Sequence, residues 1–158
     1  MATIRTLRTA QSGFTLLELV LVAGIIAVTA AIAIPRYGRA ATRHKADLAA
    51  RRVAADLRHA QLYARTTSAS CTVAFTPSTN TYQLMNAPSL DGVGGVYTVD
   101  LTAPPYEARI VSANFGGVTQ VVFSAWGLPN KAGTAVVAVG SEQRTITVNG
   151  QTGQVTIQ

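Results

Sequence analysis

The sequence has few of the residues from which enzyme sites are built. Its 158 residues include one cysteine, Cys71, and two histidines, His44 and His59. They contain no His-Glu-x-x-His, no Gly-x-Ser-x-Gly, no phosphate-binding loop and no cysteine cluster. One cysteine allows no intrachain disulfide, so we expect Cys71 to be a free thiol buried in a strand. The composition therefore predicts a protein that is not an enzyme and has no metal or cofactor.

The few remaining candidates for a chemical site are poor. His44 and His59 are fifteen residues apart on a basic helical segment, which is a poor metal arrangement, and we expect both to be solvated. The glycine-rich segment 92–95 lies in a turn-rich loop, without the following helix that a phosphate site needs.

Acidic residues are scarce as well. Seven Asp and Glu stand against thirteen Lys and Arg, and the formal net charge is +6. The excess lies in residues 36–65, which contain eight Lys or Arg and two Asp. Such a stripe can bind nucleic acid or acidic lipid head groups. The stretch contains only two tyrosines, Tyr37 and Tyr63, and no succession of aromatic residues that could serve as stacking platforms. The favoured interpretation is therefore a solvated helix face, with DNA binding as the alternative.

One long apolar run dominates the N-terminal part. From Phe14 to Ile34 the only charged side chain is Glu18, and twelve positions are large and apolar. As a helix the run would rise about 31 Å, close to the hydrocarbon thickness of a bilayer. Those apolar residues favour insertion by roughly 5 kcal/mol, whereas Glu18 costs about 3 kcal/mol or less. The run therefore predicts a membrane helix in which Glu18 needs a partner.

A chain break after Gly13 would supply that partner. The new amino group of Phe14 cannot easily meet its own Glu18, but a neighbouring copy shifted along the helix axis could present it directly. An ammonium and a carboxylate about 4 Å apart attract by roughly 4 kcal/mol at an effective dielectric of 20. The pair would offset the burial cost and fix the stagger between chains.

Two simpler interpretations compete with an assembly role. The first is a secretory signal, with Arg5 and Arg8 as its basic region and cleavage near residues 31–33. The second is a plain single-pass anchor. Against both, Glu18 is an unusual residue for such segments, and an intramembrane carboxylate indicates a functional site.

The segment Ser12-Gly13-Phe14-Thr15-Leu16-Leu17-Glu18-Leu19 resembles the processing and methylation signature of type IV pilins and of type II secretion pseudopilins. The resemblance implies cleavage between Gly13 and Phe14 by a prepilin peptidase, N-methylation of Phe14, and a docking role for Glu18 among pilin or pseudopilin subunits. It also implies a single-pass protein of the bacterial inner membrane, in contact with its lipid, with a periplasmic C-terminal domain. Basic residues after Pro35 would by themselves place that flank in the cytoplasm.

A helical pattern resumes after Pro35 and is expected to end near Thr66. One apolar stripe should be buried under the C-terminal domain; it consists of Ala46, Ala50, Val53, Leu57, Ala60 and Ala64. Asp47 with Arg51, and Arg52 with Asp56, stand at four-residue spacing. We expect both pairs to form on the exposed side of the helix.

The remainder of the chain has the pattern of short strands separated by turn residues. Strands are predicted at 71–75, 81–85, 96–101, 109–112, 118–124, 134–139, 144–148 and 154–157. The predicted fold is α+β, with a long N-terminal helix, membrane-spanning in its first half, packed on a small antiparallel β-sandwich or curled sheet. The predicted parts are a leader (1–13), a membrane and filament-core helix (14–35), the soluble half of that helix (36–66) and a periplasmic β-rich domain (67–158).

The C-terminal part carries a second resemblance. Residues 123–127 (Phe-Ser-Ala-Trp-Gly), Gly133-Thr134 and residues 148–155 are similar to the minor pseudopilins called GspH and to FimT-like pilins. The resemblance implies a structural minor pseudopilin of a type II secretion pseudopilus. The alternative is a FimT-like minor type IV pilin involved in pilus assembly or DNA uptake. Some FimT-like relatives bind DNA through arginines after the last glycine, but Gly153 is followed by no arginine.

Overall fold

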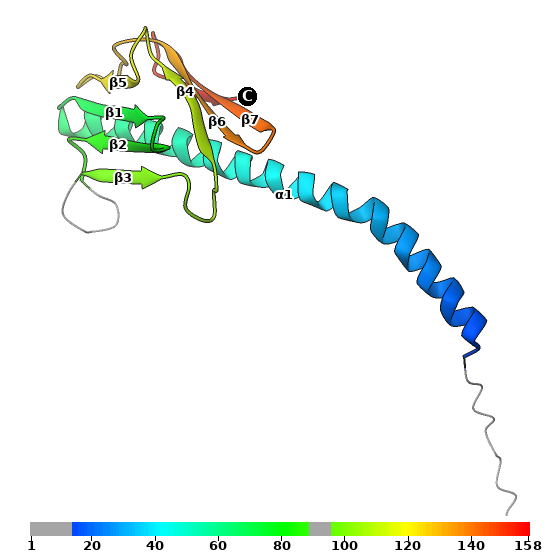
Figure 1. Ribbon diagram of the computed structural model, residues 1–158. Helices are drawn as coiled ribbons and strands as arrows, with labels where there is room; N and C mark the ends of the chain where they lie inside the picture. The colour runs from blue at the N-terminus through cyan, green and yellow to red at the C-terminus, as the bar shows by residue number, and fades with distance from the viewer. Residues whose placement is uncertain (1–13, 89–95) are drawn as a thin grey trace, which may run out of the picture. The chain divides into compact units, whose positions relative to one another are not determined.

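A computed structural model describes residues 14–88 and 96–158, apart from the side chains of residues 32–36. The chain divides into two compact units, Met1–Gly38 and Arg39–Gln158. Helix α1 (Leu16–Thr67) begins in the first unit and ends in the second (Figure 1). It continues through Pro35, because a proline removes only one helical N–H. The predicted helix is thus confirmed to within two residues at its start and one at its end.

The predicted membrane-spanning segment 14–35 includes residues 32–35, whose side chains lie outside the described residues. In the part of the chain that the structure describes, no helix reaches the length and apolar character needed to cross a membrane. The predicted leader 1–13 and the glycine-rich segment 92–95 also lie outside the described residues.

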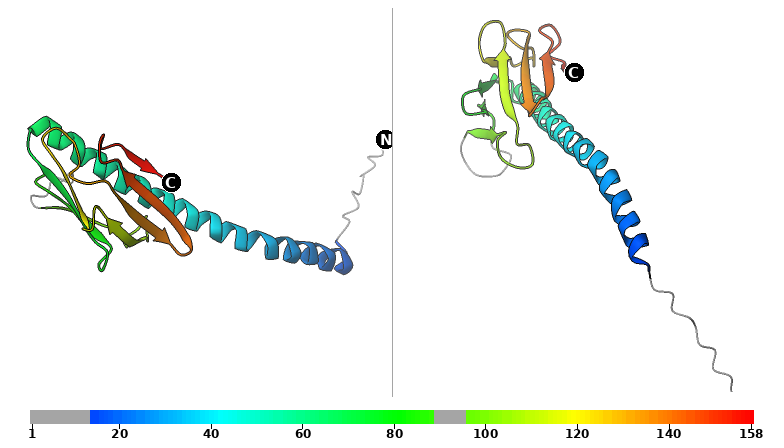
Figure 2. Two further views of the ribbon diagram at one scale, coloured as in Figure 1. Left: turned by 90° about the horizontal axis from the view of Figure 1, so that it is seen from above. Right: turned by 45° about the vertical axis from the view of Figure 1, so that its right-hand side comes forward.

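The second unit contains eight strands within its described residues, and all eight predicted strands are confirmed with ends that differ by at most two residues. They are β1 (Cys71–Thr76), β2 (Thr81–Met85), β3 (Tyr97–Asp100), β4 (Arg109–Asn114), β5 (Gln120–Phe123), β6 (Gly133–Val139), β7 (Glu142–Val148) and β8 (Val155–Ile157). One antiparallel sheet has the order β3-β2-β1-β5 and the other the order β4-β6-β7-β8. In Figures 1 and 2 the C-terminal turns of α1 lie alongside both sheets. The predicted α+β fold is confirmed.

The core of this unit forms between the apolar stripe of α1 and the inner faces of the sheets. Every residue of the predicted stripe is fully buried. Period-2 alternation brings Tyr82 and Leu84 inward from β2, and Val137 and Ile146 inward from the second sheet. Cys71 is buried in β1 as a free thiol, as predicted, and its burial raises the pKa of the thiol.

One of the two predicted helical ion pairs is wrong. Asp47 pairs with Arg144 of β7, whose Nε lies 2.5 Å from Asp47 Oδ1. Because Arg144 is largely buried, its contact loses less to solvent screening than an exposed pair along the helix would. Arg51 is therefore left on the helix surface without the predicted partner.

Candidate functional site

The predicted docking residue Glu18 lies at the start of α1. The Thr15 hydroxyl accepts a hydrogen bond from the Glu18 backbone N–H at 3.2 Å, and the Thr15 carbonyl accepts one from Leu19 at 3.1 Å. Thr15 is thus the N-cap, and Glu18 occupies the third helical position of a Thr-x-x-Glu pattern. A carboxylate in the first turn also interacts favourably with the positive end of the helix dipole. The cap therefore places Glu18 at a defined point of the helix end.

The Glu18 carboxylate is available for a partner. Its side chain is exposed, and no residue in the described parts of the chain donates a hydrogen bond to it or forms an ion pair with it. Phe14, one turn earlier, is 83% exposed. Gly13 lies outside the described residues. The structure therefore brings Phe14 and Glu18 to one helix end, while trimming, methylation and docking stay predictions.

The helix surface that follows Glu18 is apolar and exposed. Its large exposed side chains from Leu19 to Val28 are Leu19, Val20, Leu21, Val22, Ile25, Ile26 and Val28. The only hydroxyl among the later residues of this stretch, that of Thr29, bonds to the carbonyls of Ile25 and Ile26 at 3.0 and 2.9 Å. A helix whose polar side chain is satisfied internally is suited to apolar surroundings.

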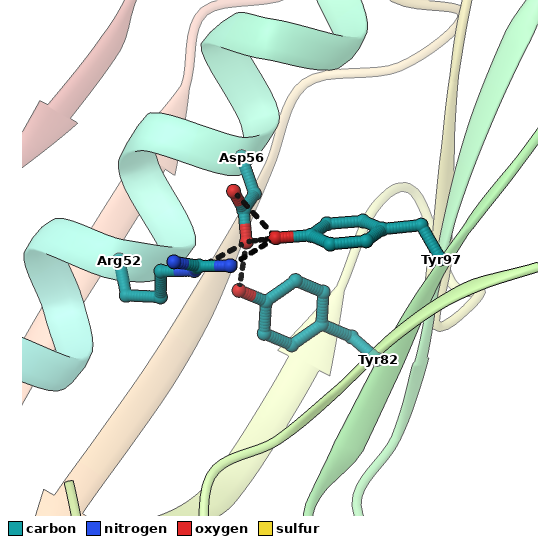
Figure 3. Close-up of polar contacts among 4 residues, drawn as sticks. All are labelled: Arg52, Asp56, Tyr82 and Tyr97. Carbon is teal, nitrogen blue, oxygen red and sulfur yellow. Dashed lines mark hydrogen bonds and ion pairs between the residues drawn. The ribbon is translucent and has the colours of Figure 1, made fainter. Parts of the chain in front are cut away.

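A buried polar cluster joins α1 to the first sheet. Asp56 is only 4% exposed, and its Oδ2 accepts hydrogen bonds from Arg52 Nε at 3.0 Å and from the Tyr82 hydroxyl at 2.5 Å. The Tyr97 hydroxyl lies 3.4 Å from both carboxylate oxygens and accepts a bond from Arg52 (Figure 3). The predicted pair of Arg52 with Asp56 therefore forms, but its expected exposure is wrong, because two strand tyrosines cover it. The cluster links α1 to β2 and β3.

This cluster predicts a loss of stability in alkali. Burial first, and then the Asp56 charge, raise the pKa of Tyr82 and of Tyr97 above the ordinary phenol value. A raised native pKa means that the stabilisation is complete below the unfolded value near 10 and is lost as the pH rises above it. We expect the free energy of unfolding to fall above about pH 10, by up to about 1.4 kcal/mol per pH unit for each tyrosine.

Denaturant titrations of the full chain between neutral pH and pH 11 measure this effect. Tyr82→Phe should reduce the slope, because one of the two shifted phenols is then missing. An equal slope in the variant and the parent would contradict the assignment.

The C-terminal segments of the sequence resemblance meet on the helix. Gln61 Nε2 donates hydrogen bonds to the carbonyls of Gly127 at 2.9 Å and Thr152 at 3.3 Å. Gly127 and Gly153 have φ values of +73° and +70°. A Cβ on Gly153 would lie 2.3 Å from Gln61 Nε2. Both glycines are therefore favoured by their left-handed backbone conformation, and Gly153 also by the Gly127 carbonyl oxygen, which would lie 2.9 Å from an added Cβ.

Gly133, another residue of that resemblance, also has a packing reason. A Cβ at this position would lie 2.2 Å from the Asn114 carbonyl oxygen and 2.5 Å from Phe115 Cα. Both are backbone atoms, so they cannot move aside as a flexible side chain would. The resemblance in the tail thus marks points where the fold needs glycine.

The histidine prediction is half right. His44 is exposed, but His59 is partly buried, and its buried Nδ1 has no hydrogen-bond partner among the residues that the structure describes. Its ring packs beside Tyr63, with the two centroids 6.3 Å apart. A search of the described residues found no group of three or more His, Cys, Asp or Glu able to hold a metal ion.

Comparisons with known proteins agree with this geometry. A family model described as "Type II transport protein GspH" matches residues 49–152, and a model described as "Prokaryotic N-terminal methylation motif" matches residues 8–34. A search of curated proteins found no match.

The chain is also similar to a solved structure, the type IV minor pilin FimU of Pseudomonas aeruginosa. The two share 12% sequence identity with a TM-score of 0.51, over 73% of this chain and 90% of FimU. The likeness shows a pilin fold, in which a long N-terminal helix packs on antiparallel sheets. The family match covers more than half of the chain, so the chain belongs to the GspH family of type II pseudopilins, which are structural proteins and not enzymes.

Proposed function

We propose that this chain is a minor pseudopilin subunit of a type II secretion pseudopilus. The family and the methylation motif imply a precursor anchored in the inner membrane, processed by a prepilin peptidase and assembled with other pilins. In the proposed sequence of events the precursor crosses the membrane once, with its C-terminal domain in the periplasm. It is cut after Gly13, methylated on Phe14, and stacked through residues 14–35 into a short filament.

The exposed carboxylate of Glu18 carries the proposal. It stands beside the N-cap of α1, and the apolar residues that follow it are exposed in the first unit. A charge in apolar surroundings is tolerated when an opposite charge pairs with it. The amino group of Phe14 on a neighbouring subunit provides that charge after cleavage, and the pair then sets the axial offset between subunits.

Trimming can be tested at Gly13. Replacing Gly13 with leucine should leave the precursor uncut, because a bulky side chain obstructs the peptidase at the residue before the scissile bond. Mass spectrometry of the protein recovered from host membranes measures the mature N-terminus. Ser12→Ala is the matched control and should be trimmed normally.

The parent protein itself can overturn the proposal. We expect it to begin at a methylated Phe14. A parent protein that still begins at Met1, or that begins beyond Pro35, contradicts processing at this site and the assembly role that depends on it.

A second candidate function is that of a FimT-like minor type IV pilin in pilus assembly or DNA uptake. Two observations favour it: the fold likeness to the type IV minor pilin FimU, and the exposed arginines of α1. The absence of an arginine after Gly153 speaks against DNA capture through that segment. Salt-dependent binding of the full chain to duplex DNA distinguishes the two functions, since phosphate contacts weaken steeply with salt.

A further inference from the structure

Three arginines of α1 form a row on one face of the helix. Arg51, Arg58 and Arg65 follow one another at seven-residue intervals and are exposed, so neighbours in the row are about 10 Å apart along the axis. Within the described residues, the side chains of Arg51 and Arg65 form no ion pair or hydrogen bond, and the Arg58 side chain donates only to the Val155 carbonyl, at 2.8 Å. The row therefore presents positive charge that this chain does not neutralise.

Exposed apolar side chains border the C-terminal end of the row. Leu62 lies between Arg58 and Arg65 on the helix and is 59% exposed, and Trp126 is 83% exposed. Gly127, the residue after Trp126, packs on the Arg65 stem: a Cβ added there would lie 2.4 Å from Arg65 Cδ. We call Arg51, Arg58, Leu62, Arg65 and Trp126 the arginine face.

The loop that carries Trp126 is held in place. Gly127 donates its N–H to the Ser124 carbonyl at 2.7 Å, and Ser124 donates to the Leu128 carbonyl at 2.9 Å. Gln61 of α1 fixes the same loop through the Gly127 carbonyl. A tryptophan on a supported loop loses little conformational freedom when a partner covers it. Trp and Arg are also the side chains that most often dominate binding energy at protein interfaces.

We propose that the arginine face docks an acidic surface of a different pilin-type subunit; the inference rests on the proposed function. A second copy of this chain is a poor occupant, because most of its described carboxylates are already paired with its own cations. Those in ion pairs are Asp47, Asp56, Glu107 and Glu142. Asp100 bonds to Thr102, and Glu18 is assigned to the docking of Phe14. Copies meeting at this face would place unpaired arginines against a basic protein.

DNA fits this face less well than an acidic protein does. Three cations spaced about 10 Å apart meet only a minority of the phosphates on the duplex that they span, since each strand carries one every 3.4 Å. One exposed indole offers no succession of rings for stacked bases. DNA is accordingly an outcome that the test can detect.

The test places a photoreactive phenylalanine analogue at position 62 of the full chain in host membranes. Position 62 leaves all three arginines intact. We expect light to produce an adduct with a second, different pilin-type subunit, and mass spectrometry of the adduct should find the cross-linked segment rich in Asp and Glu. The double variant Arg58→Glu, Arg65→Glu should lower the yield at least tenfold. The control Arg109→Glu, Lys131→Glu changes the charge equally at exposed positions outside α1 and should leave the yield unchanged.

The outcomes separate this inference from the function on which it rests. A chain that enters filaments but gives no adduct, an adduct with itself, or an adduct with DNA overturns the inference alone. An adduct yield that is unchanged in the double variant Arg58→Glu, Arg65→Glu overturns it as well. A parent chain that is never trimmed and never enters filaments overturns the proposed function, and the inference falls with it.

Discussion

Glu18→Ala should abolish incorporation of the protein into filaments while leaving membrane insertion and trimming after Gly13 intact. In the proposed docking, the substitution removes an attraction of roughly 4 kcal/mol between Glu18 and the Phe14 ammonium of the neighbouring subunit, which corresponds to about a thousandfold weaker contact. Insertion should become easier, because the variant no longer carries an acid into the membrane. The measurement is the fraction of processed protein that sediments with sheared filaments.

Two further variants separate charge from helix structure. Thr15→Ala removes the N-cap hydrogen bond to Glu18 N–H, at a cost of about 1 kcal/mol to the helix start, but keeps the carboxylate and should assemble. Glu18→Gln keeps the shape and loses the charge, so it should fail as Glu18→Ala does. Normal incorporation of Glu18→Ala would show that another contact sets the stagger.

The secondary structure was predictable because its signals are local. The strand pattern of period two and the helical stripe of Ala46, Val53 and Leu57 depend only on neighbours in the sequence. Each of those stripe residues is fully buried, as the spacing required. The burial of Cys71 was predictable in the same way, since the alternation of β1 places this residue on the inner face.

The polar contacts of α1 were not predictable by the same reasoning. Four-residue spacing correctly paired Arg52 with Asp56, but it could not reveal that Tyr82 and Tyr97, 26 and 41 residues further on, would bury the pair. Asp47 pairs not with Arg51 but with Arg144, which stands 97 residues further along the chain. One signal was present: Asp56 stands three residues after Val53 and four before Ala60, so it lies beside two stripe residues on the helix.

The candidate site rests on a different kind of signal and stays a prediction. Phe14 and Glu18 were found through a motif, and their proposed partners lie on another copy of the chain. A single subunit can show only that the Glu18 carboxylate is exposed and the adjoining helix surface apolar. Conversely, nothing in the motif indicated the arginine face, which depends on Gly127 bringing the Trp126 loop to Arg65.

Asp56→Ala should destabilise the second unit by about 3 to 5 kcal/mol, because it leaves Arg52 and two tyrosine hydroxyls around a site that has lost its acceptor. That is a large part of the 5 to 15 kcal/mol by which domains are commonly stable. Denaturant unfolding of the full chain, followed by tryptophan fluorescence, measures the loss. Tyr82→Phe removes one hydrogen bond to a charged group and should cost about 1.5 to 3 kcal/mol.

The matched control is Asp47→Ala on the same helix. Its carboxylate also pairs with an arginine of the sheet, but Asp47 is 41% exposed, so water can solvate what the substitution leaves behind and the cost should stay near 1 kcal/mol. The double variant Asp56→Ala, Tyr82→Phe should lose less than the sum of the single variants, because the two residues share one hydrogen bond. Equal costs for Asp56→Ala and Asp47→Ala would mean that burial of the cluster does not determine how firmly α1 is held to the first sheet.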